Sequence, residues 1–290
     1  MTSTAAKSAA LRAWWPAPAK LNLFLHVTGR RADGYHDLQT VFQLLDWGDD
    51  IGIEITDDVR VERIEGPAGI SPADDLAVRA ARALQAATSV RHGARIRVRK
   101  RIPLGGGLGG GSSDAATTLL VLNRLWGTAL KPAELAALGL GLGSDVPIFV
   151  HGSSAWAEGR GEELTPLELP PAWYLVVWPG VAVATAGIFQ APELTRNSPL
   201  ITIRALSPGQ TRNDCEPLVR SRYPPVAAAL DWLGARTSAR LSGTGSCVFA
   251  SFASAAEAER VAARVPDEWR AYVARGVNQS PLVAALASIT

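Results

Sequence analysis

The sequence predicts a mixed α/β fold, because patterns typical of strands and of helices both recur along its 290 residues. Apolar and polar side chains alternate over residues 19–27 and again over 94–102, and a period of two indicates a strand. A glycine-rich stretch then joins the second of these strands to a helix whose apolar residues are spaced over 115–126. A chain of this length can bury one large core or two modest ones.

Composition excludes several classes of protein. The chain is 47% hydrophobic and 19% charged, and its net charge of +2 is too small to indicate a nucleic-acid surface. The two cysteines, Cys215 and Cys247, fit neither a disulfide framework nor a metal site, which favours a reducing cytoplasm. The uncharged run over residues 173–189 is too short for a membrane span. Residues 1–13 contain no apolar signal-peptide core and are expected to form a disordered extension.

The first strand places two polar side chains side by side. Strict alternation puts one set of residues, Leu21, Leu23, Leu25 and Val27, on one face, and another set, Lys20, Asn22, Phe24 and His26, on the opposite face. Lys20 and Asn22 therefore project together, either into a site or, in the plainer alternative, from a solvated edge strand.

A turn follows at Asp33 and Gly34, directly before Tyr35 and His36. An aromatic ring beside an imidazole can stack on a nucleobase and hydrogen-bond its edge. The alternative is an ordinary solvated loop histidine. The next stretches predict strands over residues 38–46 and 51–55, interrupted at 47–50.

A helix is predicted over residues 73–87, with Arg79 and Arg82 on its exposed face. Beyond it, the stretch from Pro103 to Ser113 reads PLGGGLGGGSS and indicates a phosphate cradle. Glycine lets a polyphosphate approach backbone N–H groups, and the first amides of the following helix attract anions. Ser112 is expected to cap that helix. The alternative is a flexible loop.

Two familiar phosphate motifs do not fit this loop. A P-loop requires a lysine and then Ser or Thr after its last glycine, whereas Gly111 is followed directly by Ser112 and Ser113. The residues Gly105, Gly107 and Gly110 satisfy GxGxxG, but the acidic residue that a dinucleotide site needs about 20 positions later is not evident.

The remaining elements are predicted from similar signals. A helix is expected over residues 132–140, and Asp145 with Pro147 behind it is typical of a helix N-cap. The glycine-rich, charged stretch over 151–167 predicts a hairpin and marks the expected boundary between two halves. The second half predicts a strand at 173–178, a loop holding Thr185, and helices near 214–222, 225–234 and 254–264.

A second glycine turn, RLSGTGSCVFAS at residues 240–251, leads into an apolar strand. Gly243 and Gly245 flank a hydroxyl side chain and could frame a phosphate or a substrate, or merely form a tight connection.

Three stretches together resemble the motifs of the GHMP kinase superfamily: PAKLNLFL at 18–25, PLGGGLGGGSSDAA at 103–116 and LSGTGSC at 241–247. Three others, at 31–46, 143–150 and 212–216, resemble the members that act on 4-diphosphocytidyl-2-C-methyl-D-erythritol. The resemblance implies an α/β (α+β) two-lobed GHMP kinase fold. Its N-terminal lobe, residues 14–160, would be like domain 2 of ribosomal protein S5, and its C-terminal lobe, residues 161–290, would be ferredoxin-like.

The resemblance also implies a reaction, in which ATP phosphorylates the 2-hydroxyl of that diphosphocytidyl alcohol in the non-mevalonate route to isoprenoid precursors. The implied catalytic residues are Lys20 and Asp145, and the implied acceptor-binding residues are Asn22, Tyr35, His36 and Thr185. ATP would be held by Lys100, Pro103, Leu104, Gly105, Gly106, Gly107, Leu108, Gly109, Gly110, Gly111, Ser112 and Ser113. No residue is assigned as a metal ligand, because Mg²⁺ is expected to arrive on ATP.

Other interpretations remain open from sequence. The chain could be a GHMP kinase for homoserine, mevalonate or a sugar, although Tyr35 and His36 argue against this, or a catalytically silent nucleotide-binding regulator. Asp114 either faces away from ATP or approaches its Mg²⁺. No nucleic-acid or membrane partner is expected, and the expected state is a monomer or weak homodimer.

Overall fold

The computed structural model describes residues 14–203 and 211–288. The extension expected over residues 1–13 lies outside the described residues. The strands are β1 (Trp14–Arg30), β2 (His36–Thr56), β3 (Val61–Glu65), β4 (Gly93–Arg99), β5 (Ala155–Glu158), β6 (Glu163–Pro166), β7 (Trp173–Trp178), β8 (Arg240–Leu241), β9 (Val248–Phe252) and β10 (Arg270–Val277). The helices are α2 (Leu76–Thr88), α3 (Gly110–Leu125), α4 (Pro132–Leu140), α5 (Val146–His151), α6 (Thr185–Phe189), α7 (Glu216–Arg222), α8 (Pro224–Gly234), α9 (Ala255–Ala262) and α10 (Pro281–Ala287).

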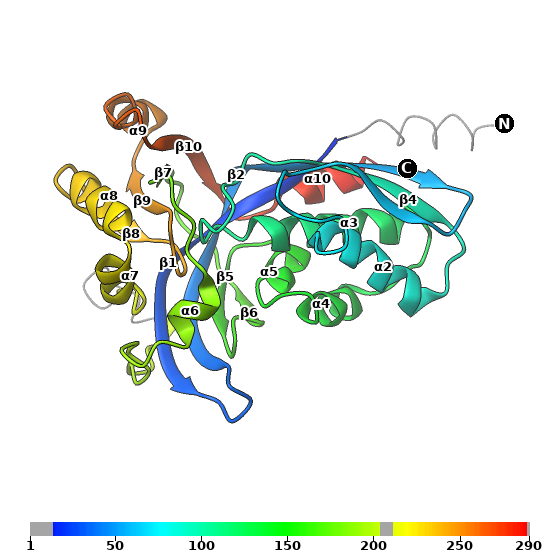
Figure 1. Cartoon of the computed structure of the whole chain (residues 1–290), viewed down its shortest axis with the longest axis horizontal. Coiled ribbons are helices and arrows are strands. Elements are labelled where there is room, and N and C mark those ends of the chain that lie inside the picture. The colour runs from blue at the N-terminus through cyan, green and yellow to red at the C-terminus, as the bar shows by residue number, and fades with distance from the viewer. Residues whose placement is uncertain (1–13, 204–210, 289–290) are drawn as a thin grey trace.

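The long antiparallel pair β1 and β2 forms the spine of the molecule and runs through both halves (Figure 1). The sheet continues from β2 in two directions, with strand order β3-β4-β2-β10-β7-β9-β8, and the hairpin of β5 and β6 pairs with β2. The hairpin predicted over 151–167 is therefore confirmed. Helices α2, α3, α4, α5 and α10 pack in one half, and α7, α8 and α9 lie in the other (Figure 1).

The break predicted at residues 47–50 is wrong, because β2 is continuous there. Its residues Gly48 and Asp49 pair with Pro18 and Ala17 of β1, so the turn-like sequence is held in extended conformation by its neighbour. A Cβ on Gly48 would lie 2.0 Å from the Ala17 carbonyl oxygen. The glycine thus permits a close approach of strands and does not mark a loop.

Two separate hydrophobic clusters fill the halves. The first is built on Ile53, Leu84, Ile96 and Leu119, and the second on Leu175, Val177, Val219 and Leu230. The chain end returns to the first half, since β10 pairs with both β7 and β2 and Leu282 of α10 joins the first cluster. The boundary expected at residue 160 stays a prediction.

A third cluster joins the halves and anchors the glycine loop. It contains Leu21 of β1, Val176 of β7, Phe249 of β9 and Leu108, whose side chain is fully buried. Of the two leucines in the glycine-rich stretch, Leu104 is exposed and Leu108 is buried, so the burial of Leu108 fixes the loop to the core.

The solvated edge strand considered for residues 19–27 is wrong, because Lys20 and Asn22 are both buried. Backbone outside the sheet covers this edge of β1: Lys20 N–H donates to the Leu108 carbonyl and Leu25 N–H to the Arg212 carbonyl, each at 3.0 Å. Register shifts in the β1–β2 ladder also break the simple alternation.

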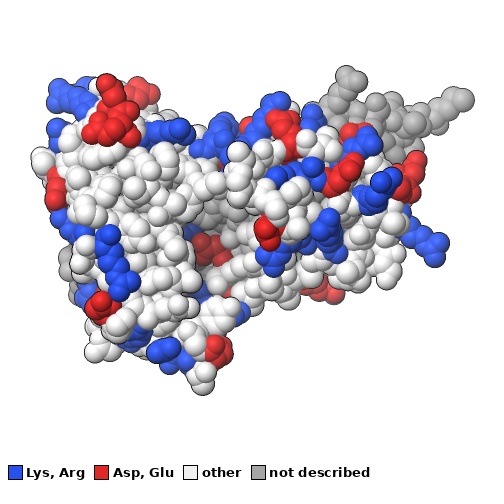
Figure 2. All heavy atoms as spheres, viewed as in Figure 1, with Lys and Arg blue, Asp and Glu red and all other residues white. Residues whose placement is uncertain are grey.

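Charges on the visible face are mixed in sign (Figure 2). Among the described helices, none is both long enough and apolar enough to cross a membrane.

Candidate active site in the cleft

A cleft of about 720 Å³ lies where the two halves meet, within the size range of small-molecule sites. The space-filling view shows it as a hollow with charged side chains inside (Figure 2). The structure brings together eight of the residues predicted from sequence on its walls: Lys20, Asn22, Tyr35, His36, Gly107, Ser112, Asp145 and Thr185. Residues more than 150 positions apart in sequence therefore form one site.

Lys20 is only 3% exposed, and its ammonium group lies among three oxygen atoms. Nζ donates to Asn22 Oδ1 at 2.6 Å and to the Gly107 carbonyl at 3.1 Å, and it forms an ion pair with Asp145 Oδ2 at 3.2 Å. Asn22 donates in turn to Thr40 Oγ1 at 3.0 Å. Asn22 thus orients the lysine, and the charge of Lys20 is placed between the glycine loop and Asp145.

Asp145 occupies the N-cap position of α5, with a proline in the first turn, as the plainer interpretation of its sequence predicts. Its side chain makes no capping hydrogen bond, however, and instead faces Lys20. The carboxylate is 32% exposed on the wall of the cleft. The arrangement leaves one carboxylate oriented by a cation and open to a ligand.

The glycine loop uses its carbonyl groups to hold itself in place. Ser246 N–H and Cys247 N–H donate to the carbonyls of Gly105 and Gly106 at 3.1 and 3.0 Å, and Ser242 Oγ donates to the Gly107 carbonyl at 3.0 Å. The second glycine turn is therefore the support of the first. Because these carbonyls are bound on one side, the loop keeps a fixed shape beside the cleft.

Ser112 is not the cap of α3, contrary to the sequence-based expectation. The helix begins earlier, at Gly110, and its N-cap is Gly109, whose φ of +73° suits glycine. Ser112 lies in the first turn and lines the cleft, whereas Ser113 is fully buried. The first N–H groups of α3 have no acceptor within the helix and remain suited to an anion.

Beneath the loop, Lys100 is held between two buried carboxylates, Asp49 and Asp114. Its Nζ donates to Asp49 Oδ2 and, at 2.7 Å, to Asp114 Oδ2. Asp49 Oδ1 also accepts from the N–H groups of Arg101 and Ile102, which lead into the loop. Lys100 does not line the cleft. Asp114 contacts this buried lysine and does not line the cleft. Of the two alternatives that its sequence position left open, it therefore faces away from the proposed ATP site.

The buried cluster contains two carboxyl groups and one ammonium group, and the pKa values of Asp114 and Lys100 both depart from their ordinary values. Burial raises the pKa of Asp114 to about 8, against the lowering effect of Lys100, and Asp49 adds to the rise. Burial opposes the charge on Lys100, but Asp114 and Asp49 together raise its pKa above the ordinary value. Asp114 Oδ1 has no hydrogen-bond partner. The cluster therefore favours a protonated Asp114 beside a charged Lys100.

Asp114→Asn is expected to stabilise the protein more at about pH 8 than at about pH 5. The folded protein keeps a proton on Asp114 that the unfolded chain releases, because the pKa lies far above its ordinary 3.8 when folded. Stability therefore falls as pH rises between these two pKa values, and an amide removes that dependence. Thermal melts of wild type, Asp114→Asn and the exposed control Asp267→Asn measure the effect. An equal shift at both pH values would contradict it.

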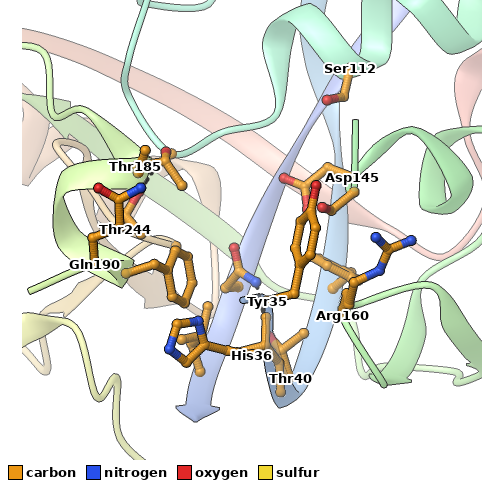
Figure 3. A pocket seen from close by; sticks show the side chains of 18 of the residues that line it. Tyr35, His36, Thr40, Ser112, Asp145, Arg160, Thr185, Gln190 and Thr244 are labelled. Atoms are coloured by element: carbon orange, nitrogen blue, oxygen red, sulfur yellow. Dashed lines mark hydrogen bonds between the residues drawn. The ribbon is translucent and has the colours of Figure 1, made fainter. Parts of the chain in front are cut away.

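Tyr35 and His36 occupy the end of the cleft away from the glycine loop, and they differ in exposure. Tyr35 is 51% exposed, and its ring stacks against the guanidinium of Arg160 at 4.7 Å. His36 is buried and stacks on Phe189, with ring centroids 5.4 Å apart and planes 29° apart. Figure 3 shows the Tyr35 ring projecting between the two walls, with Asp145 and Ser112 above it.

The wall of the cleft that faces Asp145 carries hydroxyl groups (Figure 3). Thr185 Oγ1 and Thr244 Oγ1 are 3.0 Å apart, and Gln190 lies beside them (Figure 3). Thr244 is the hydroxyl residue between Gly243 and Gly245, so the second glycine turn does reach the cleft, as one of its two interpretations predicted. Thr185 begins α6 and does not lie within a loop.

Sequence reasoning missed several residues of the site. Arg160, Phe189 and Gln190 line the cleft but carry no local motif. Arg160 lies within the charged hairpin turn and Phe189 ends a short helix, so each could have been suggested only by its neighbourhood. Phe42 also lines the cleft and has the spacing of an ordinary strand residue.

The comparisons with known proteins agree with this geometry. The GHMP kinases N terminal domain matches residues 75–153, and the GHMP kinases C terminal domain matches residues 193–271. The chain therefore belongs to the GHMP kinases, whose expected two-lobed fold is confirmed. These are ATP-using enzymes.

Two relatives of 58% identity show to which family of GHMP kinases the chain belongs. The 4-diphosphocytidyl-2-C-methyl-D-erythritol kinase of Halorhodospira halophila is 58% identical over 276 residues, covering 94% of this chain and 96% of that protein. The enzyme of the same name from Aromatoleum aromaticum is 58% identical over 267 residues, covering 92% and 94%. The chain belongs to the 4-diphosphocytidyl-2-C-methyl-D-erythritol kinase family.

Solved structures extend the comparison. A crystal structure of 4-(cytidine 5'-diphospho)-2C-methyl-D-erythritol kinase superposes with a TM-score of 0.77 at 36% identity, covering 90% of this chain and 97% of that one. The mevalonate kinase of Methanococcus jannaschii superposes with a TM-score of 0.67 at 16% identity, covering 92% and 99%, which shows a shared fold alone.

Proposed function

We propose that the chain transfers the γ-phosphoryl group of ATP to the 2-hydroxyl of 4-diphosphocytidyl-2-C-methyl-D-erythritol, a step of the non-mevalonate route to isoprenoid precursors. The observation that carries this proposal is the Lys20–Asp145 pair, 3.2 Å apart, on a cleft with the glycine loop at one end and aromatic rings at the other. Family membership supports the choice of acceptor.

In the proposed reaction, the acceptor oxygen forms a bond to the γ-phosphorus while the bond to the ADP oxygen breaks. Asp145 orients the hydroxyl group and accepts its proton. Lys20 stabilises the charge on the transferring group and, through the ion pair at 3.2 Å, orients the carboxylate of Asp145. Positioning and electrostatic stabilisation are the main contributions in phosphoryl transfer.

The glycine loop holds the phosphates through backbone amides, helped by the N-terminus of α3. The proposed nucleotide-binding residues Gly107 and Ser112 lie on the cleft wall. Lys100 acts from below the loop, where its contacts with Asp49 and Asp114 fix the start of the loop and the N-terminal part of α3. Its contribution to ATP binding is then indirect.

Mg²⁺ is proposed to enter with ATP. Hard oxygen ligands suit this ion, and it often binds through one or two protein oxygens together with phosphates. The Ser112 hydroxyl is such an oxygen on the cleft wall. Within residues 14–203 and 211–288, no group of three or more His, Cys, Asp or Glu side chains is arranged to hold a metal by itself. When bound, the ion offsets the negative charge of the phosphates.

The acceptor is proposed to place its cytosine between Tyr35 and His36 and its hydroxyl at Asp145, with Thr185 on the facing wall. Aromatic faces on both sides of the cleft support this arrangement, since stacking is a common way to bind a base. The proposed state is a monomer or weak homodimer. Both thiols are free and buried, which fits the proposed cytoplasmic location.

His36→Ala is expected to raise the acceptor KM and leave the ATP KM nearly unchanged. Loss of a stacking and hydrogen-bonding ring should cost about 1–3 kcal/mol of acceptor binding. Steady-state kinetics with each substrate varied in turn measure the acceptor KM and the ATP KM separately. A normal acceptor KM with a raised ATP KM would overturn the placement of the acceptor.

The proposed function is tested by offering alternative acceptors. Pure protein with MgATP is incubated separately with 4-diphosphocytidyl-2-C-methyl-D-erythritol, homoserine and mevalonate, and ADP formation is followed. The proposal predicts rapid ADP formation with the first acceptor alone. Faster turnover of homoserine or mevalonate would assign another GHMP activity, and ATP binding without turnover of any acceptor would support the regulator.

A further inference from the structure

Arg196 lies outside the reaction centre, yet it contacts the His36 ring and the backbone of Phe189 at the acceptor end of the cleft. Its Nε donates to His36 Nε2 at 2.9 Å. Its other two nitrogens donate to backbone carbonyls, at 2.5–3.4 Å, at the end of α6 and in the segment that follows it. The acceptors are the carbonyl oxygens of Phe189, Ala191, Pro192 and Leu194. All the nitrogens of the guanidinium are thus engaged, which fixes its plane.

This contact determines the protonation state of His36. A guanidinium has donors only and stays charged, so His36 Nε2 must be the acceptor and carries no proton. The neutral ring then has its proton on Nδ1, because the bond at one nitrogen sets the tautomer at the other. Burial, then the charges of Arg196 and Arg30, lower the pKa of His36, while Asp37 opposes them.

The same guanidinium also fixes the partner of that imidazole. Arg196 Nη2 donates to the Phe189 carbonyl at 2.9 Å, and the Phe189 ring stacks on His36. One side chain thus links the tautomer of the imidazole to the position of the neighbouring aromatic ring. Both rings line the cleft.

We propose that Arg196 is a positioning residue for acceptor recognition, which holds His36 as a neutral ring with Nδ1–H as its donor and holds Phe189 against it. The acceptor end then presents a fixed hydrogen-bond donor beside a fixed aromatic face, a combination suited to a pyrimidine base. This inference rests on the proposed function, because it assumes that His36 contacts the acceptor.

The first test uses Arg196→Met, which keeps an apolar stem and removes the donor to His36. At about pH 8 the acceptor KM is expected to rise about tenfold, with kcat and the ATP KM nearly unchanged. The defect should shrink at about pH 6, because a protonated imidazole regains Nδ1–H whichever tautomer its neutral form prefers. In wild type, where Nδ1–H is already fixed, the acceptor KM should change little between these pH values.

The matched control is Arg222→Met. Arg222 donates to the Gly187 carbonyl and to Glu193 in the same part of the chain. Its loss also removes arginine contacts to this segment without touching His36, so the acceptor KM is expected to stay near wild type. A raised KM in Arg196→Met that is equal at both pH values would show general support of the segment and would overturn the tautomer role.

A second measurement needs neither acceptor nor turnover. Nitrogen-15 NMR of the imidazole rings in wild type, with the His36 signals assigned by their loss in His36→Ala, should show the proton on Nδ1. A proton on Nε2 would overturn the inference even if Arg196→Met fails to fold. If His36→Ala raises the acceptor KM but Arg196→Met does not, the inference fails and the proposed function stands. If His36→Ala leaves the acceptor KM unchanged, the proposed acceptor site fails, and this inference with it.

Discussion

Asp145→Asn is expected to lower kcat by about 100-fold or more, the effect typical of removing an acid–base or charge-orienting group. The change keeps the shape of the side chain but removes the charge that faces Lys20 at 3.2 Å. Affinity for ATP should survive, because a carboxylate near phosphates does not help to bind them. Steady-state kcat with both substrates saturating measures the effect.

Lys20→Met is expected to produce a loss of similar size. The side chain is buried and its ammonium contacts Asn22, Gly107 and Asp145, so no water can replace it easily. If the two charges perform one task, the double variant should be little slower than the slower single variant. Additive losses in this cycle would show that Lys20 and Asp145 contribute independently.

The control for the pair is Asp231→Asn, which removes the carboxylate of an exposed ion pair with Arg220. Surface ion pairs contribute little, so kcat and melting temperature should stay near wild type. Thermal melts of all variants exclude simple unfolding. A near-wild-type kcat for Asp145→Asn would reduce that residue to the plain helix N-cap.

Gly107→Ala is expected to destabilise the protein by more than about 3 kcal/mol and to weaken ATP binding. Gly107 has φ of +73°, and an added Cβ would lie 2.2 Å from the Ser242 carbonyl oxygen. The two glycine turns must then separate, which also moves the Gly107 carbonyl that Lys20 contacts. Denaturant unfolding and calorimetric titration with ATP measure the two effects.

Gly127→Ala is the matched control, because Gly127 has φ of +67° but open space where a Cβ would be. It should cost only the conformational penalty, about 1–2 kcal/mol, and leave ATP binding intact. If the two variants lose equal stability, the close packing of the glycine turns is not what requires glycine at position 107.

Local sequence signals predicted the regular elements well. The helix over 132–140 and the strand over 173–178 lie where the periodicity placed them. The glycine loop does join a strand to a helix N-terminus. These features depend on side-chain period and on glycine conformation, which a short window of sequence contains.

Features that depend on distant backbone could not be predicted in this way. Gly48 looks like a turn residue, and only its contact with Ala17 shows that β2 continues through it. Lys20 looks solvated until the Leu108 carbonyl closes the free edge of β1. The cap assigned to Ser112 failed because Gly109 starts the helix without any side-chain bond.

Residues in and around the cleft likewise divide into those that local motifs predict and those that depend on distant parts of the chain. Lys20, Asp145, Tyr35 and His36 were suggested by motifs, whereas Arg196 lies 160 positions beyond His36 and has no motif. Its role depends on the path of the segment after α6, which determines where the guanidinium meets the imidazole.

Phosphorus-31 NMR of the complete reaction tests the central claim most directly, because it separates transfer to the acceptor from hydrolysis of ATP. With MgATP and 4-diphosphocytidyl-2-C-methyl-D-erythritol, wild type should produce a new phosphomonoester signal from phosphate on the 2-hydroxyl of the acceptor. The amount of this product should equal the amount of ADP. Asp145→Asn should produce that signal far more slowly. Inorganic phosphate and ADP without a phosphomonoester, or a phosphate on another hydroxyl group, would contradict the proposed function.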